Sequence, residues 1–220
     1  MTIHFPEGFW WGAAASGPQT EGRLPNDNKG TSIWDHWYKT NPEKFFQGQG
    51  PGQTTQVLTH FQEDLRCMEE IGFNSFRTSI QWSRLIPKGR GKVDPEAVAF
   101  YHQYFDEMLA RGIEPFVNLY HFDMPMTLQN EGGWLNRDTV KAFGDYAQIC
   151  FDLFGDKVKH WFTQNEPIVP VEMGYLYQQH YPAVVDLSMA VQVGYHEALA
   201  SALAIQKFRQ SACDGQIGII

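Results

Sequence analysis

Short apolar runs alternate with longer segments of helical period along the whole chain, and this alternation restricts the fold more than any other feature. Apolar residues recur at three- and four-residue steps in four segments, and a glycine lies between each segment and the next apolar run. The predicted helices span about residues 54–71, 94–111, 136–154 and 188–209. The predicted strands span residues 9–14, 73–80, 113–120, 159–164 and 216–220. Strands that alternate with helices favour an α/β fold whose strands pair in parallel through right-handed crossovers.

Local signals mark some of the boundaries. Asp94 precedes Pro95, which is the order of an N-cap and a first helical residue, and Ser188 is predicted to cap the fourth helix. The longest connections from strand to helix span residues 15–53, 121–135 and 165–187. Long loops at one end of parallel strands mark the functional face of such a sheet.

The number of units sets the architecture. Four and a half βα units cannot close an eight-stranded barrel, which needs about 250 residues. We therefore expect one domain, residues 1–220, that forms the N-terminal part of a (β/α)8 TIM barrel with the first four βα units and the start of the fifth strand. A doubly wound sheet is the alternative, and it is disfavoured because no G-x-G-x-x-G opens directly into a helix after the first strand.

Charge and cysteine content exclude several classes of function. The chain has 17 basic and 25 acidic residues, a net charge of −8, which argues against nucleic acid and anionic membranes as partners. No apolar stretch of about 18 residues is present, and the N-terminus does not have the pattern of a signal peptide. The three cysteines fit neither a disulfide framework nor a zinc site. We expect a cytoplasmic protein with reduced cysteines and no metal or other cofactor.

TQNEP, at residues 163–167, follows the fourth predicted strand. Pro167 biases Glu166 away from helical geometry, so this carboxyl group is expected at a strand's carboxyl end, where barrel enzymes place catalytic groups. The alternative is that Glu166 is a solvated loop residue without a catalytic role. Asn165 can donate to and accept from a sugar hydroxyl, or it can cap a turn.

LYHFDMP follows the third predicted strand and contains His121 and Asp123. Extended geometry would place both side chains on one face, which would suit a pair of metal ligands, but no third ligand has suitable spacing. His121 is therefore interpreted as a hydroxyl partner in a cleft, with a buried structural histidine as the alternative.

Two arginines belong to RTSIQWSRL, at residues 77–85. Arg77 lies in an apolar strand, and because an unpaired buried guanidinium is costly, it is expected to meet a carboxylate inside the barrel. Arg84 is expected in a surface or rim ion pair.

The first long loop contains Gln19, Trp34 and Trp37. The Gln19 amide suits two adjacent hydroxyls. Tryptophan faces stack on the apolar face of a pyranose, although ordinary loop packing explains these two residues nearly as well.

Together these motifs resemble glycoside hydrolase family 1, the family of β-glucosidases and 6-phospho-β-glucosidases. FPEGFWWGAAASGPQTEG is similar to the N-terminal signature of the family, RTSIQWSRL to its second-strand motif, and TQNEP to its acid/base motif. The motifs occur in the family's order, and the resemblance covers the whole chain.

The resemblance implies retaining hydrolysis of β-glycosides by two carboxyl groups without a metal. Glu166 matches the general acid that later acts as the base. Gln19, His121 and Asn165 match glycone-binding positions, with Asn165 on the 2-hydroxyl. Arg77 matches the arginine that pairs with the nucleophile.

The chain departs from the family at several points. The nucleophile's Thr/Ser-Glu-Asn-Gly motif does not occur in these residues, so the second carboxyl and the C-terminal barrel half are expected outside them, and the 220-residue piece alone is expected to be inactive. Phe122 replaces a frequent tryptophan and is still expected, with Trp34, among the substrate-binding residues, and Gln164 replaces a frequent phenylalanine.

The substrate is inferred from two further motifs. HFDMP and GTSIWDHW are similar to the 6-phospho-glycosidase branch, so a 6-phospho-β-glucosidase is the leading hypothesis. An unphosphorylated β-glucosidase or β-galactosidase, and a non-catalytic sugar-binding fragment, are the alternatives. The substrate would be a β-glycoside or 6-phospho-β-glycoside, and the oligomeric state is left open.

Overall fold

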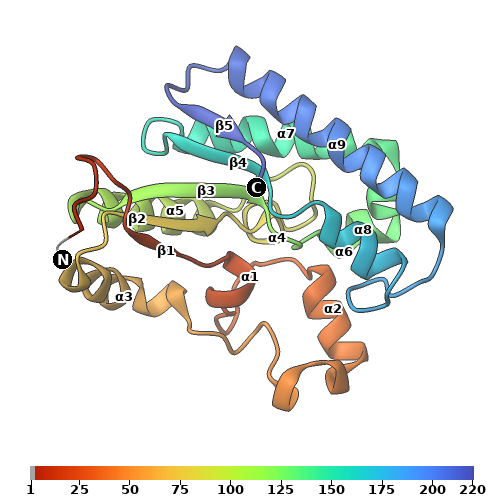
Figure 1. Cartoon of the computed structure of the whole chain (residues 1–220). Coiled ribbons are helices and arrows are strands. Elements are labelled where there is room, and N and C mark those ends of the chain that lie inside the picture. Colours follow the sequence, from red (N-terminus) through yellow and green to blue (C-terminus); the bar gives the residue numbers. More distant parts are fainter. Residues whose placement is uncertain (1–2) are drawn as a thin grey trace.

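Five parallel strands lie side by side in chain order, β1-β2-β3-β4-β5, in the computed structural model, which describes residues 3–220. The strands are β1 (Gly12–Ala14), β2 (Ser75–Ser79), β3 (Glu114–Tyr120), β4 (His160–Gln164) and β5 (Gln216–Gly218). Each strand pairs with the next in parallel (Figure 1). A strand order with no reversal excludes the doubly wound alternative, which has a switch point.

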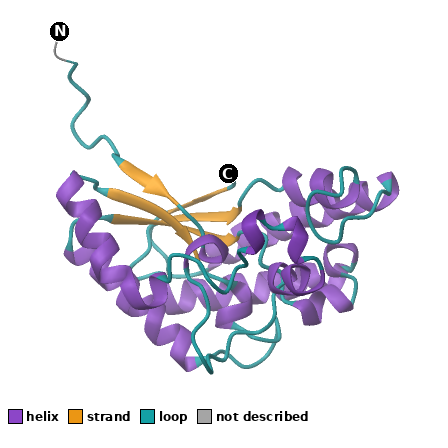
Figure 2. Cartoon of the chain, turned by 90° about the horizontal axis from the view of Figure 1, so that it is seen from below, coloured by secondary structure: helices purple, strands orange, loops and turns teal. Residues whose placement is uncertain are grey.

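Four long helices connect successive strands. They are α3 (Val57–Ile71), α5 (Pro95–Ala110), α7 (Arg137–Phe154) and α9 (Leu187–Gln210). The helices gather on one side of the sheet, as expected for an outer layer around a barrel wall (Figure 2). The predicted helices are thereby confirmed, with starts that differ by up to three residues.

The ends of these helices follow the sequence signals in most places. The Asp94 side chain accepts from the Glu96 backbone N–H, with Pro95 at the first helical position. Gly72 ends α3 with φ of +89°, a conformation that favours glycine. The predicted Ser188 cap is wrong: α9 begins at Leu187, so Asp186 is the cap and accepts from Met189 N–H.

The long loops contain short helices that the sequence analysis did not predict. They are α1 (Gly17–Thr20), α2 (Ile33–Thr40), η1 (Pro42–Lys44), η2 (Phe46–Gly48), α4 (Trp82–Leu85), α6 (Met126–Asn130), η3 (Gly133–Leu135) and α8 (Ile168–Tyr175). Helices α1, α2, α6 and α8 lie toward the carboxyl ends of the strands (Figure 1). The loops at the carboxyl ends of the strands therefore contain several short helices.

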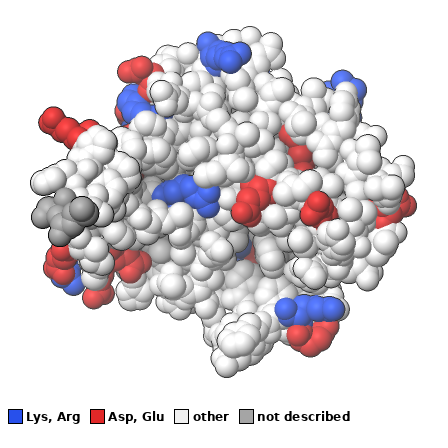
Figure 3. Space-filling view, viewed as in Figure 1, with Lys and Arg blue, Asp and Glu red and all other residues white. Residues whose placement is uncertain are grey.

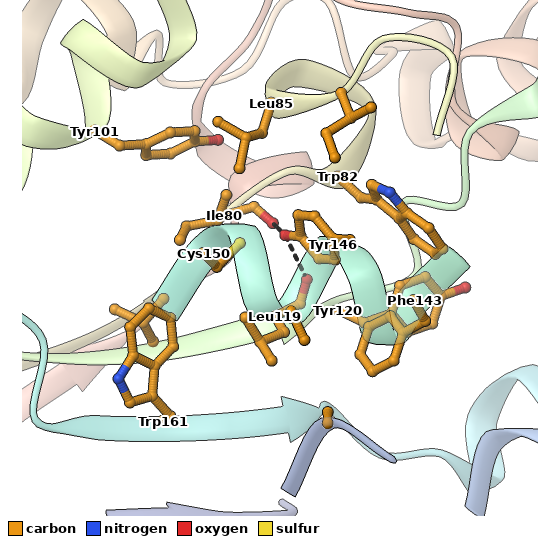
Figure 4. Close-up of a cluster of buried hydrophobic side chains, with 14 of the residues drawn as sticks. Ile80, Trp82, Leu85, Tyr101, Leu119, Tyr120, Phe143, Tyr146, Cys150 and Trp161 are labelled. Atoms are coloured by element: carbon orange, nitrogen blue, oxygen red, sulfur yellow. Dashed lines mark hydrogen bonds between the residues drawn. The ribbon is translucent and has the colours of Figure 1, made fainter. Parts of the chain in front are cut away.

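The core lies between the sheet and the long helices. The Tyr146 hydroxyl of α7 is fully buried there, 2.9 Å from the Ile80 carbonyl oxygen and 2.8 Å from that of Leu119 (Figure 4). The indole of Trp82 stacks on the same tyrosine ring with centroids 5.1 Å apart. These contacts tie α7 to the carboxyl ends of β2 and β3, where the functional loops begin.

Charged groups are scattered on the face drawn in Figure 3, and no large basic patch is visible on it. Within residues 3–220, no helix combines the length and apolarity needed to cross a bilayer.

Candidate active site

Most of the candidate residues lie at or just after the carboxyl ends of the strands. Ala15 N–H donates to the Arg77 carbonyl oxygen at 2.9 Å, and Asn165 N–H donates to that of Tyr120 at 3.0 Å. These bonds continue the strand ladders by one residue and fix where each loop leaves the sheet. The end of β1 therefore lies beside β2, and the end of β4 lies beside that of β3.

A cavity of about 560 Å³ opens between these loops. Four predicted substrate-binding residues line it, namely Gln19, Trp34, His121 and Phe122. The rest of the lining is Ser16, Pro18, Phe45, Gln49, Gly50, Pro51, Gln53, Thr54, Val169, Met173, Gln179 and His180. Among residues 3–220, no lysine, arginine or carboxylate belongs to the lining, so these residues offer the cavity aromatic faces, amides and hydroxyls.

Gln19 lies in α1, directly after β1. Ser16 Oγ donates to its side-chain oxygen at 2.9 Å. This bond orients the amide, and the side chain stays exposed at the cavity mouth.

His121 is 7% exposed and lies at the end of β3. Its Nδ1 is 3.3 Å from the Asn118 Nδ2, which is a donor, so Nδ1 accepts and Nε2 carries the proton. Burial, with a smaller contribution from the Arg77 charge, lowers the pKa of His121 to about 4. The imidazole is thus neutral at physiological pH and presents an N–H donor.

Asp123 does not share a face with His121, contrary to the expectation from extended geometry. Strand β3 ends at Tyr120, and the chain turns so that Asp123 is fully buried. Its two oxygens accept from Trp82 N–H at 2.5 Å and His121 N–H at 3.2 Å, and burial raises its pKa to about 7. This carboxyl group links the third βα loop to the segment after β2.

Glu166 and Asn165 lie at the end of β4. Asn165 is 4% exposed and donates from Nδ2 to Glu166 Oε2 at 3.2 Å. Glu166 has φ of +41° and is exposed, and its N–H donates to the Ile220 carbonyl oxygen at 2.7 Å. A positive φ in a non-glycine residue costs about 1–3 kcal/mol and tends to occur at functional sites. Phe122, at the end of β3, has φ of +64°.

Arg77 is not paired with a carboxylate in the part of the chain that the structure describes. Its Nε is buried without a hydrogen-bond partner, and it forms no ion pair within 4.0 Å among residues 3–220. Burial lowers the pKa of Arg77, and the Glu166 charge partly opposes this. Because the charges of Glu166 and Arg77, and of Arg77 and His121, affect one another, these groups lie within electrostatic range.

Arg84 is buried, contrary to the prediction of a surface or rim pair. It is 4% exposed, and its guanidinium pairs with Glu21 at 2.6 Å and Asp27 at 3.0 Å. Glu21 also accepts from the Tyr101 hydroxyl at 2.8 Å and the Gln81 amide at 2.7 Å. This network fixes the loop two residues after Gln19, a role that no sequence signal indicated.

The structure therefore brings the candidates together in two groups. Gln19, Trp34, His121 and Phe122 line the cavity. Arg77 lies in the middle of β2, Asn165 and Glu166 lie at the end of β4, and none of these three is part of the lining. Trp37 is buried beside Trp34, with ring centroids 5.5 Å apart, and packs the loop. His180 and Gln179 line the cavity as well, and the sequence analysis missed them.

A parallel sheet that carries an arginine within one strand, and an asparagine and a carboxyl at the end of another, beside an aromatic cavity, suits a glycosidase barrel. The profile of Glycosyl hydrolase family 1 matches residues 1–220, and the chain belongs to this family. It is 57% identical over 216 residues to 6-phospho-beta-glucosidase GmuD of Bacillus subtilis, with 98% of this chain and 46% of the relative covered. It is 39% identical to a 1,4-beta-D-glucan glucohydrolase of Thermotoga neapolitana, with 98% and 51% covered.

Solved structures agree with the fold. The family 1 β-glucosidase from Thermotoga maritima superposes with a TM-score of 0.94 at 38% identity, covering 98% of this chain and 48% of that one. The prediction of a partial (β/α)8 barrel is thus confirmed. The chain spans about half the length of the curated relatives it matches.

Proposed function

We propose that this chain forms the acid/base half of a retaining β-glycoside hydrolase, with Glu166 as the group that transfers the proton. The observation that carries the proposal is the strained Glu166, with φ of +41°, at the end of β4 beside Asn165 and within electrostatic range of Arg77. Barrel enzymes place catalytic groups at this edge of the sheet.

In the proposed reaction Glu166 protonates the glycosidic oxygen while a second carboxylate attacks the anomeric carbon. Glu166 then removes a proton from the water that releases the sugar. Retaining enzymes hold the two carboxyl groups about 5–5.5 Å apart. We assign the nucleophile to a segment outside these 220 residues, because its motif does not occur here and because Arg77 has a buried Nε that a further carboxylate would satisfy.

The cavity residues are proposed to hold the glycone. Gln19 would bind two adjacent hydroxyls with its oriented amide, and neutral His121 would donate from Nε2 to another. Asn165 would hold the 2-hydroxyl, a contact that strengthens in the transition state. Phe122 and Trp34 would supply apolar faces for the ring.

For the substrate we propose a 6-phospho-β-glucoside. The identity of 57% to a 6-phospho-beta-glucosidase, against 39% to a glucan glucohydrolase, supports this choice. Since phosphorylated sugars are intracellular metabolites, a cytoplasmic location accompanies the proposal.

The second candidate is hydrolysis of the unphosphorylated glucoside, favoured by a cavity without lysine or arginine in its lining. The test compares 4-nitrophenyl β-glucoside with its 6-phosphate in the enzyme in which this chain forms the first half of the barrel. A higher kcat/KM for the 6-phosphate supports the first proposal, and faster turnover of the free glucoside overturns it. No hydrolysis of either would favour the non-catalytic alternative.

A further inference from the structure

Gln164 is the last residue of β4, and its side chain is fully buried against α9. Its Nε2 donates to the Glu197 backbone carbonyl oxygen, within α9, at 3.1 Å. A carbonyl oxygen has two lone pairs, so Glu197 can accept from Gln164 and still accept a bond within the helix. The amide therefore joins the end of the strand to the helix. The frequent phenylalanine that Gln164 replaces has no donor for such a bond.

A second hydrogen bond anchors the preceding residue of the strand. Thr163 is fully buried, and its Oγ1 lies 2.7 Å from the Ser201 Oγ of α9. Ser201 follows Glu197 by four residues, so the two partners lie on the same face of the helix. The last two residues of β4 are thus fixed to one helix face by two buried hydrogen bonds.

The surroundings of the Gln164 anchor are buried and favour neutral groups. Glu197 is 1% exposed, and neither of its carboxyl oxygens has a hydrogen-bond partner among residues 3–220. Burial raises the pKa of Glu197 well above its usual value, which favours the protonated, neutral form. A hydrogen bond in such an environment is electrostatically stronger than the same bond in water, so the Gln164 amide is a firm anchor.

Glu166, two residues after Gln164, needs such support. It is exposed and has φ of +41°, and strained backbone of this kind persists only where the surrounding structure holds it. Its N–H donates to the Ile220 carbonyl oxygen at 2.7 Å, and its own carbonyl oxygen accepts from Val169 N–H at 2.8 Å. These two bonds hold Glu166 itself, whereas Gln164 and Thr163 hold the strand that leads into it.

We propose that Gln164 is a positioning residue for the general acid: its amide fixes the end of β4 on α9 and thereby holds the Glu166 carboxyl group where it protonates the glycosidic oxygen. This inference rests on the proposed function, because Glu166 is the acid there. Gln164 acts through Glu166, since it is fully buried and does not line the cavity. A displacement of about 1 Å can cost about 10²-fold in rate, so loss of the anchor should reach the proton transfer.

The experiment compares two leaving groups in the active enzyme in which this chain forms the first half of the barrel. The kcat/KM of a dinitrophenyl glycoside is divided by that of the phenyl glycoside with the same glycone, phosphorylated or not as the enzyme requires. The phenyl group needs a proton to depart, whereas the dinitrophenyl group does not. Gln164→Met keeps a long side chain but removes the amide, and we expect it to raise this ratio at least about tenfold. A general loss of folded enzyme would instead lower both values together.

Gln81→Met is the matched control. Gln81 follows β2, is 1% exposed, and donates from Nε2 to the Glu21 carboxylate at 2.7 Å. Its Oε1, like that of Gln164, is buried without a hydrogen-bond partner in the described chain. The substitution therefore removes an equally buried amide beside another strand, and it should leave the ratio unchanged. An equal rise in the ratio for Gln81→Met and Gln164→Met would overturn the inference.

Ser201→Ala keeps the test decisive if Gln164→Met does not fold. It removes the partner of the Thr163 hydroxyl while alanine favours the helix, and it should raise the ratio in the same direction. An unchanged ratio in the variants that fold overturns this inference, while a raised ratio for Glu166→Gln still supports the proposed function. If Glu166→Gln also leaves the ratio unchanged, the acid role itself is overturned.

Discussion

Arg84 Nε donates to Glu21 Oε2 at 2.6 Å, and both side chains are at least nine-tenths buried. The bond joins the loop after β1 to the segment after β2. Since Glu21 lies two residues after Gln19, the pair sets the position of one wall of the cavity. It also explains why a long polar loop is ordered at this edge.

Removing one partner should therefore be costly. We expect Glu21→Gln to lower the free energy of unfolding by about 1–3 kcal/mol, because Arg84 keeps Asp27 as a charged partner but loses its charge-assisted bond to Glu21. Urea denaturation measures the loss. The double variant Glu21→Leu, Arg84→Met should lose less free energy of unfolding than the summed losses of Glu21→Leu and Arg84→Met alone. Losses that add strictly would show that the two charges are not coupled.

Glu166→Gln tests the acid role. We expect kcat/KM to fall by about 10²–10⁴-fold for substrates with a poor leaving group, which needs a proton to depart. The glycosylation step with an activated nitrophenol leaving group should lose much less, since that group departs without protonation. Pre-steady-state measurement of the first step separates the two classes. Equal losses for both would remove Glu166 from the acid role.

The lowered pKa of His121 predicts that the free energy of unfolding depends on pH. Its folded pKa of about 4 lies below the usual 6.5, so the folded state binds fewer protons than the unfolded state between these values. Protonation of His121 therefore does not reduce the free energy of unfolding above about pH 6.5. As the pH falls from 6.5 to 4, it reduces this free energy by about 3 kcal/mol.

The measurement compares denaturation at pH 7 and pH 4.5. His121→Asn keeps an acceptor near Asn118 but cannot titrate, so its stability should fall less than that of the wild type over this interval. His102→Asn, on α5 outside the cavity, is the control and should follow the wild type. A steeper fall for His121→Asn than for the wild type would contradict the buried, neutral histidine.

Much of the sheet and its four long helices could be predicted because each long helix has an apolar stripe and a terminal signal. The position of Glu166 was also predictable, since Pro167 ends a short apolar run. The helices of the loops were not predictable in this way. Helices α1, α6 and α8 span at most eight residues, so they show too few turns for a periodic pattern.

Burial of polar groups was the other feature that local patterns missed. Arg84 was expected in a surface or rim pair, and Asp123 was considered only as a metal ligand. Their partners are Glu21 and the Trp82 backbone, 63 and 41 residues away. His180 lies in an irregular segment with no periodic signal. In each case the contact depends on how two loops meet in three dimensions, which no window of sequence contains.

Tyr146 offers a test of the core beneath the site. Its hydroxyl lies between the carbonyl oxygens of Ile80 and Leu119, at the carboxyl ends of two neighbouring strands (Figure 4). Tyr146→Phe keeps the ring that stacks on Trp82 but leaves these carbonyls without their donor. We expect a loss of about 1–3 kcal/mol in the free energy of unfolding. Urea denaturation measures this loss. The control is Tyr38→Phe, because the Tyr38 hydroxyl donates to the exposed Gly48 carbonyl oxygen, and its loss should be smaller. Equal losses would mean that the buried bonds stabilise the fold no more than a surface bond does.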